Sequence, residues 1–206
     1  MRILAIGSHP DDIEVGCGGT LTKYSKEGHE IYLLVMTEGE QGGAEKIRKT
    51  EQEKAAKLVK AKKLFWGKSK DTEIHANLET IQIIEKIIKT INPVFIFTHY
   101  HDDTHQDHRH LSSAVTSAAR YTKNVLFYEG PTTHGFQPTI FIDINEVLEE
   151  KVALVKAHAS QVERTNITGL SIVDIVLSSA NFRGVQGRVK NAEAFVPVRM
   201  FINITE

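Results

Sequence analysis

ILAIGSHPDD, residues 3–12, is the stretch that decides the fold. Its apolar first half predicts a short buried strand, and Pro10 stiffens the turn that follows and disfavours helix at His9. One imidazole and two carboxylates at the end of a buried strand cost free energy unless a cation or a reaction uses their charge. In open α/β sheets, functional sites form beyond the carboxyl ends of parallel strands. The stretch therefore predicts an α/β fold with a site at this turn, although helix capping by Asp11 or Asp12 would also explain the carboxylates.

A second cluster, HYHDDTHQDH at residues 99–108, follows another apolar strand at residues 94–97. It contains four of the ten histidines of the chain. In a doubly wound sheet the first and fourth strands commonly lie side by side at the topological switch point, so both clusters would face one crevice. Imidazole and carboxylate groups together suit zinc or ferrous iron. The alternative is a solvated polar loop with a helix cap, and the matching cluster at residues 9–12 argues against it.

The remaining segments alternate between strand and helix patterns. This alternation predicts a single domain over residues 1–206, with a Rossmann-like, mostly parallel sheet flanked by helices. Further strands are expected at residues 31–36, 63–66, 125–128, 139–143 and 195–204. Helices are expected at residues 21–27, 44–61, 80–91, 108–121, 145–160 and 171–182.

Composition excludes several classes of protein. A formal net charge of -1 provides no broad basic field for nucleic acid or an anionic membrane. The single cysteine, Cys17, excludes a disulfide framework and cysteine-rich zinc sites. No apolar run approaches the ~20 residues needed to span a bilayer, and the chain enters its first strand without a signal peptide pattern. We therefore expect a cytoplasmic protein that binds neither nucleic acid nor membrane.

Several spaced motifs accompany the two clusters. HPDD at residues 9–12 and HxDH at residues 105–108 are joined by a further set: GGTL at 18–21, T-x-GE at 37–40, R-x-x-E at 48–51 and AEAF at 192–195. In these motifs the chain resembles the PIG-L/LmbE-like deacetylases, zinc enzymes that remove acetyl groups from N-acetylglucosamine-containing substrates. The resemblance implies an N-deacetylase that hydrolyses an amide bond with metal-activated water.

The resemblance also implies roles for individual residues. Three of them would hold the metal: His9, Asp12 and His108. Asp11 matches the general base of the family. His105 matches the histidine that stabilises the oxyanion or acts as general acid, with Asp107 as its orienting partner. Either Asp11 or His105 would protonate the leaving amine.

The motifs indicate fewer residues for substrate binding than for the metal and the reaction. Arg48 and Glu51 match substrate-binding positions, although an ion pair three residues apart on a helix is the alternative. Asn191 stands where relatives often have a tyrosine that assists the oxyanion or the substrate. The resemblance implies a small N-acetylated amino sugar as substrate, Zn²⁺ or another divalent metal such as Fe²⁺ as cofactor, and a homo-oligomer, trimeric or hexameric.

Two other functions use the same residues. A set of two histidines and one carboxylate also describes non-haem iron enzymes, but these typically use a cupin barrel rather than alternating strands and helices. A non-catalytic module that binds sugar and metal is the second alternative. It predicts affinity for metal and sugar without release of acetate.

Overall fold

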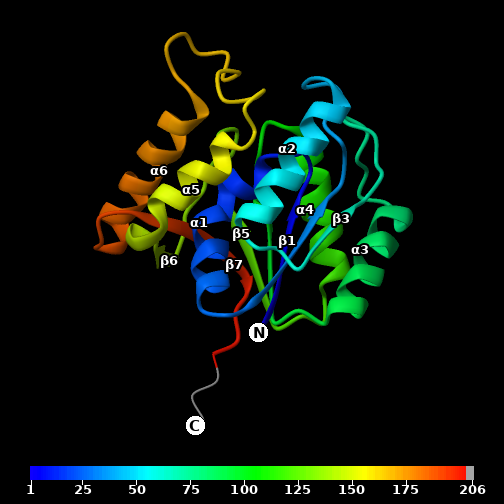
Figure 1. The fold of residues 1–206 in the computed structure, drawn as a ribbon. Helices are drawn as coiled ribbons and strands as arrows, with labels where there is room; N and C mark the ends of the chain where they lie inside the picture. Colours follow the sequence, from blue (N-terminus) through cyan, green and yellow to red (C-terminus); the bar gives the residue numbers. More distant parts are fainter. Residues whose placement is uncertain (203–206) are drawn as a thin grey trace.

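A seven-stranded sheet forms the centre of the protein in the computed structural model, which describes residues 1–202 (Figure 1). The strands are β1 (Arg2–Gly7), β2 (Glu30–Val35), β3 (Lys63–Trp66), β4 (Phe95–His99), β5 (Asn124–Tyr128), β6 (Ile140–Asp143) and β7 (Ala192–Arg199). Their order is β3-β2-β1-β4-β5-β7-β6, with β1 to β5 parallel and β7 antiparallel to both of its neighbours. The predicted single-domain, mostly parallel α/β fold is confirmed. Because β1 and β4 pair directly, their two following turns lie at one edge of the sheet.

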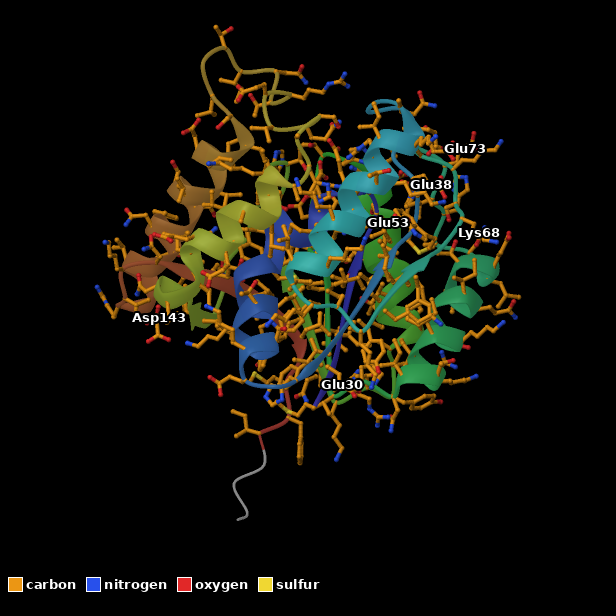
Figure 2. All side chains as sticks on the ribbon, in the orientation of Figure 1. Glu30, Glu38, Glu53, Lys68, Glu73 and Asp143 are labelled. Carbon is orange, nitrogen blue, oxygen red and sulfur yellow. The ribbon has the colours of Figure 1, made fainter. Side chains whose placement is uncertain are left out.

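Helices cover both faces of the sheet (Figure 1). They are α1 (Asp12–Lys26), α2 (Glu45–Leu58), α3 (Leu78–Ile91), α4 (Gln106–Ala118), α5 (Leu148–Lys156) and α6 (Ile172–Gly187), with a 3₁₀ turn, η1, at Asn145–Val147. Side chains alternate along β1, so that Ile3 and Ala5 pack with α1, α2 and α5, whereas Leu4 and Ile6 pack with α3 and α4. Charged side chains such as Glu53, Lys68 and Glu73 project outward (Figure 2).

Helix α1 differs most from its predicted range, residues 21–27. It begins at Asp12, directly after the turn, and is kinked at Cys17, whose φ is −144° and ψ is 17°. Close packing explains the glycines of this segment, because a Cβ at Gly16 would lie 2.2 Å from the ring of Tyr128. The helix therefore holds the turn residues rigidly from one side, with Asp12 as its first residue.

Two other elements also differ from their predicted ranges. The predicted helix at 145–160 is the 3₁₀ turn followed by α5, which ends at Lys156. The last strand runs from Ala192 to Arg199, and residues 203–204 of the predicted strand lie outside the described residues. Among residues 1–202, no helix combines the length and the apolar character that crossing a bilayer requires.

Candidate active site

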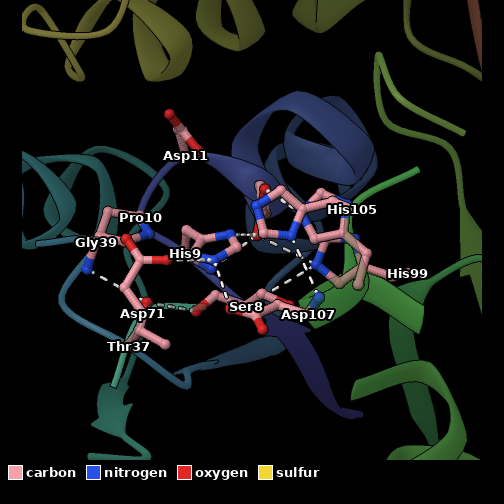
Figure 3. Close-up of polar contacts among 12 residues, drawn as sticks. Ser8, His9, Pro10, Asp11, Thr37, Gly39, Asp71, His99, His105 and Asp107 are labelled. Atoms are coloured by element: carbon pink, nitrogen blue, oxygen red, sulfur yellow. Dashed lines mark hydrogen bonds and ion pairs between the residues drawn. The ribbon is translucent and has the colours of Figure 1, made fainter. Parts of the chain in front are cut away.

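The turns after β1 and β4 bring the two sequence clusters together (Figure 3). One potential ligand atom from each of His9, Asp12 and His108 lies within 4.8 Å of the other two. A second group of the same kind consists of His9, His105 and Asp107. The prediction that residues 9–12 and 105–108 share one site is thus consistent with the geometry.

The donor set fits a divalent metal ion. His9 Nδ1 lies 3.3 Å from Asp12 Oδ2, and His108 Nε2 lies 3.4 Å from Asp12 Oδ1. The opposite ring nitrogens also face carboxylates: His9 Nε2 lies 3.1 Å from Asp107 Oδ2, and His108 Nδ1 lies 3.2 Å from Asp103 Oδ2. Histidines that bind metals commonly direct their other ring nitrogen to a carboxylate, which fixes the tautomer and the ring orientation. Both histidines show this arrangement around Asp12.

The electrostatic field of the site attracts cations. Burial alone would raise the pKa of Asp12, but His108 and His99 hold it well below its usual range. Burial opposes protonation of His108, yet the Asp12 and Asp103 carboxylates raise its pKa to about 9. Carboxylates that favour a proton on a buried imidazole favour a divalent cation for the same electrostatic reason.

Two further carboxylates lie beside His9. Asp71 Oδ1 and Asp107 Oδ2 are each 3.1 Å from His9 Nε2. The Asp107 carboxylate also accepts hydrogen bonds from the main-chain N–H groups of Thr72, at 2.8 Å, and Ile74, at 3.2 Å. The carboxylate is therefore fixed toward His9, whereas the family resemblance implied that Asp107 orients His105.

His105 is instead oriented by main chain. Its Nδ1 accepts a hydrogen bond from the main-chain N–H of Asp107, at 3.2 Å, as the N-cap of α4. Burial, with the charges of His9 and His108, lowers the pKa of His105. A neutral His105 that accepts at Nδ1 carries its proton on Nε2, which makes that nitrogen a hydrogen-bond donor.

Asp11 is held in an unusual conformation between the cavity and α2. Its φ of 98° lies in the left-handed region, which is uncommon for a residue other than glycine. Its Oδ2 lies 3.2 Å from Arg48 Nη2. Burial raises the pKa of Asp11 to about 6, with Arg48 opposing and Asp12 reinforcing the shift. A carboxylate with a pKa near the working pH suits general base catalysis.

The two predicted substrate residues bind other parts of the protein. Besides Asp11, Arg48 donates to the main-chain oxygens of Pro10, at 2.6 Å, and Gly39, at 3.1 Å. Glu51 accepts from both the main-chain N–H and the hydroxyl of Ser160, each at 2.7 Å. Arg48 lines the cavity and connects the turn to the loop after β2, whereas the carboxylate of Glu51 anchors the segment after α5.

A cavity of about 430 Å³ opens beside the cluster. Its size falls within the range of small-molecule sites. His9, Asp11, Asp12, His105 and His108 all line it. The cavity is also lined by residues outside the cluster: Gln41, Tyr128, Pro131, Arg164 and Ile172. The cavity therefore offers a substrate direct access to the residues that the sequence singled out.

Sequence reasoning gave no role to two residues of the site. His99 stacks on His108 with ring centroids 3.9 Å apart, and its Nε2 accepts from the main-chain N–H of Ser8 at 3.1 Å. Burial and the His108 charge lower the pKa of His99 to about 4. Asp103 lies in the second cluster, but only the fold reveals that it faces His108.

Asn191, the position of the tyrosine found in relatives, lies elsewhere. Its side-chain amide donates to Asn145 Oδ1 at 3.0 Å, away from the residues that line the cavity. The side chain at this position thus has no contact with the histidine cluster in residues 1–202. Tyr128 does line the cavity, but its hydroxyl donates to the main-chain oxygen of Ile6 at 2.8 Å.

Known deacetylases are similar to this chain in sequence. A family model described as PIG-L: GlcNAc-PI de-N-acetylase matches residues 4–119. An uncharacterized deacetylase of Escherichia coli K12, YaiS, is 36% identical over 167 residues, which cover 77% of this chain and 90% of the relative. A diacetylchitobiose deacetylase of Thermococcus kodakarensis is 28% identical over 188 residues, covering 78% of this chain and 70% of the relative.

A solved structure of a hydratase has the same fold. The 4-carboxy-2-hydroxymuconate hydratase GalB of Pseudomonas putida KT2440 superposes with a TM-score of 0.86, covering all of this chain and 98% of its own. Its sequence identity is 19%, so the likeness concerns the fold alone. Function has to be argued from the side chains of the site.

Proposed function

Because the chain belongs to the PIG-L family of GlcNAc-PI de-N-acetylases, we propose that it is a metal-dependent N-deacetylase acting on an N-acetylglucosamine-type sugar or conjugate. Membership of a deacetylase family supports N-deacetylation of sugar conjugates in general. Metal dependence and the individual roles of the residues are the further content of the proposal.

The observation that carries the proposal is the convergence of His9, Asp12 and His108 on the cavity. Each histidine places one ring nitrogen toward Asp12 and the other toward a carboxylate. A divalent ion held by these three residues would polarise the acetamide carbonyl and lower the pKa of water. Zn²⁺ is the expected ion, and the same donors also accept Fe²⁺ or another divalent metal.

Asp11 and His105 are assigned the proton transfers. Asp11, with a pKa of about 6, takes the proton of the attacking water, and Arg48 holds the carboxylate in place. His105 Nε2–H donates to the oxyanion that forms as water adds to the acetamide. The leaving amine takes its proton either from Asp11, which carries the proton removed from water, or from His105 in its protonated form.

The substrate proposed is a small N-acetylated amino sugar, free or conjugated. The cavity volume of about 430 Å³ suits a ligand of that class. We also propose that the protein works in the cytoplasm and assembles as a homo-oligomer, as a trimer or hexamer.

The experiment that tests the proposal measures acetate released from N-acetylglucosamine, diacetylchitobiose and N-acetylglucosaminyl conjugates. Purified protein of known metal content is assayed as isolated, after chelation, and after return of Zn²⁺ or Fe²⁺. Acetate release that is lost on chelation and restored by metal is the expected result. Metal binding without acetate release from any of these sugars would contradict the proposal.

The same assay distinguishes an enzyme from a binding module. Affinity for both metal and sugar without turnover would indicate a binding module.

A further inference from the structure

One face of α2 carries a polar side chain that the proposed chemistry does not use. Gln52 is completely buried, whereas its neighbour Glu53 projects from the surface (Figure 2). Gln52 lies four residues after Arg48, so both side chains face the turn at residues 9–12. A buried amide is costly unless its oxygen and nitrogen both find partners, and those partners indicate what the side chain does.

The oxygen of Gln52 holds the main chain of the proposed base. Gln52 Oε1 accepts a hydrogen bond from the N–H of Asp11 at 3.2 Å. Asp11 has a φ of 98°, and its side chain does not cap the helix that follows. The cost of that conformation is of the same order as the cost of leaving a buried N–H unpaired. Loss of the acceptor would therefore remove a main reason for Asp11 to remain in this conformation.

Glu14 decides which way the Gln52 amide points. Gln52 Nε2 donates to Glu14 Oε1 at 2.8 Å. With the amide reversed, the Gln52 oxygen would face the Glu14 carboxylate, and its NH₂ would face the Asp11 N–H. Both contacts would be repulsive. An acceptor-only carboxylate at residue 14 thus ensures that an oxygen is presented to Asp11.

His158 compensates the charge of Glu14. His158 Nε2 lies 3.2 Å from Glu14 Oε2, and the two residues are 1% and 2% exposed. Within residues 1–202 neither ring nitrogen of His158 has an aligned hydrogen-bond partner, so this ion-pair contact accounts for its placement. A buried carboxylate without a nearby positive charge would be strongly disfavoured. His158 therefore supports the arrangement from the segment after α5.

We infer that Gln52 is a positioning residue that holds Asp11 in the left-handed conformation, and that Glu14 and His158 fix the orientation of the Gln52 amide. The inference rests on the proposed role of Asp11 as general base. It adds three residues, none of which lines the cavity, to the machinery of the reaction. Their effect is on kcat, because they act on the geometry of the base.

The first test replaces Gln52 with leucine, which keeps the volume and removes the amide. In the metal-loaded protein, Gln52→Leu is expected to lower kcat about 10- to 100-fold, since small misplacements of catalytic groups have effects of this size. KM and metal content should stay within about twofold of wild type. Asn124→Leu is the matched control, because Asn124 is a buried amide at the opposite edge of the sheet and donates to the main-chain oxygen of Val94.

A second set of variants tests the chain of contacts and does not depend on Gln52→Leu folding. Glu14→Gln leaves the amide orientation unspecified and should lower kcat by a smaller factor. Adding His158→Gln to Glu14→Gln should change kcat less than about twofold, because His158 acts through Glu14. A folded Gln52→Leu protein with kcat within twofold of wild type, or full additivity of Glu14→Gln and His158→Gln, would overturn the inference.

A structural readout separates this inference from the proposed function. In a crystal structure of Gln52→Leu, or of Glu14→Gln if the first does not fold, Asp11 should leave the region of positive φ. A φ that stays near 98° in the leucine variant would overturn the positioning role even if no substrate is known. If wild-type protein releases no acetate, the proposed function fails, and the conformation of Asp11 still decides whether Gln52 holds it.

Discussion

Two groups of buried charges contact α1, one at its middle around Glu193 and one at its first residue, Asp12, and they are paired in different ways. Around Glu193, every charged atom has a protein partner. Its carboxylate accepts from the N–H groups of Gly19, at 2.8 Å, and Thr20, at 2.6 Å, and forms an ion pair with Lys151. Lys151 Nζ also donates to the main-chain oxygen of Val15 at 2.8 Å. This group caps the second half of the kinked helix.

In the group at the cavity, several carboxylates face the same histidine. His9 alone faces Asp12, Asp71 and Asp107. These side chains line or border a cavity, whereas the Glu193 carboxylate lies against the middle of α1. The comparison teaches that burial of charge does not identify a site, since both groups are buried. A metal site and a reaction are indicated where histidines and carboxylates converge on a cavity and the carboxylates outnumber the positively charged groups.

The largest effect is expected from His108→Ala, which removes one of the proposed metal ligands. Metal content should fall to a small fraction of wild type, and turnover should drop by roughly 10³-fold or more, because a bound metal supplies several kcal/mol of catalysis. Metal analysis and acetate release measure the two effects. Retention of stoichiometric metal with normal turnover would remove His108 from the ligand set.

Asp11→Asn should separate catalysis from metal binding within the cavity group. The asparagine keeps the shape and the hydrogen bond from Arg48 but cannot take a proton. Turnover should fall by roughly 10² to 10⁴-fold with metal content unchanged. Steady-state kinetics on metal-loaded protein provide the measurement. Unchanged turnover would show that Asp11 is not the base.

The Glu193 group should respond in stability rather than in activity. Lys151→Met leaves the buried Glu193 carboxylate without its cation and should lower the free energy of unfolding by about 3–5 kcal/mol. The kcat of the folded fraction should stay near wild type. Urea denaturation followed by circular dichroism gives the stability, and the exposed Lys156→Met is the matched surface control. A large loss of kcat at full stability would mean that this group also serves the reaction.

The elements that the sequence predicted best depend on local pattern. Strand β1, strand β4 and their polar ends follow from short apolar runs, and pairing of the first and fourth strands follows from the chirality of α/β folds. The positions of residues 9–12 and 105–108 at one edge were therefore predictable. Which residues hold the metal came from the resemblance and stays a proposal.

Long-range contacts explain what the sequence did not indicate. Helix α1 starts nine residues before its predicted start because Glu193, 174 positions from Gly19, caps its glycine-rich middle. Asp107 turns to His9 because the main chain at Thr72, from the loop after β3, donates to its carboxylate. Neither partner is visible in the local sequence. The contact of Gln52 with Asp11 could not be predicted either, because in the sequence Gln52 is one of many polar residues in a helical pattern.

The smallest effect should come from the pH dependence of the Glu14–His158 pair, and it tests whether that pair is a charged contact. Burial alone would lower the pKa of His158, but Glu14, with smaller contributions from Asp11 and Glu51, raises it above the usual value of about 6.5. A raised folded-state pKa means that the stabilisation is fully present below the unfolded-state pKa and is lost as pH rises through the folded-state pKa. The difference in unfolding free energy between wild type and His158→Gln, measured by urea denaturation of metal-free protein, should therefore be largest near pH 5.5 and shrink toward pH 8.5 and above. A difference that grows with pH would show that His158 is buried neutral, and the pair would then resemble a neutral hydrogen bond rather than the ion pair of Lys151 and Glu193.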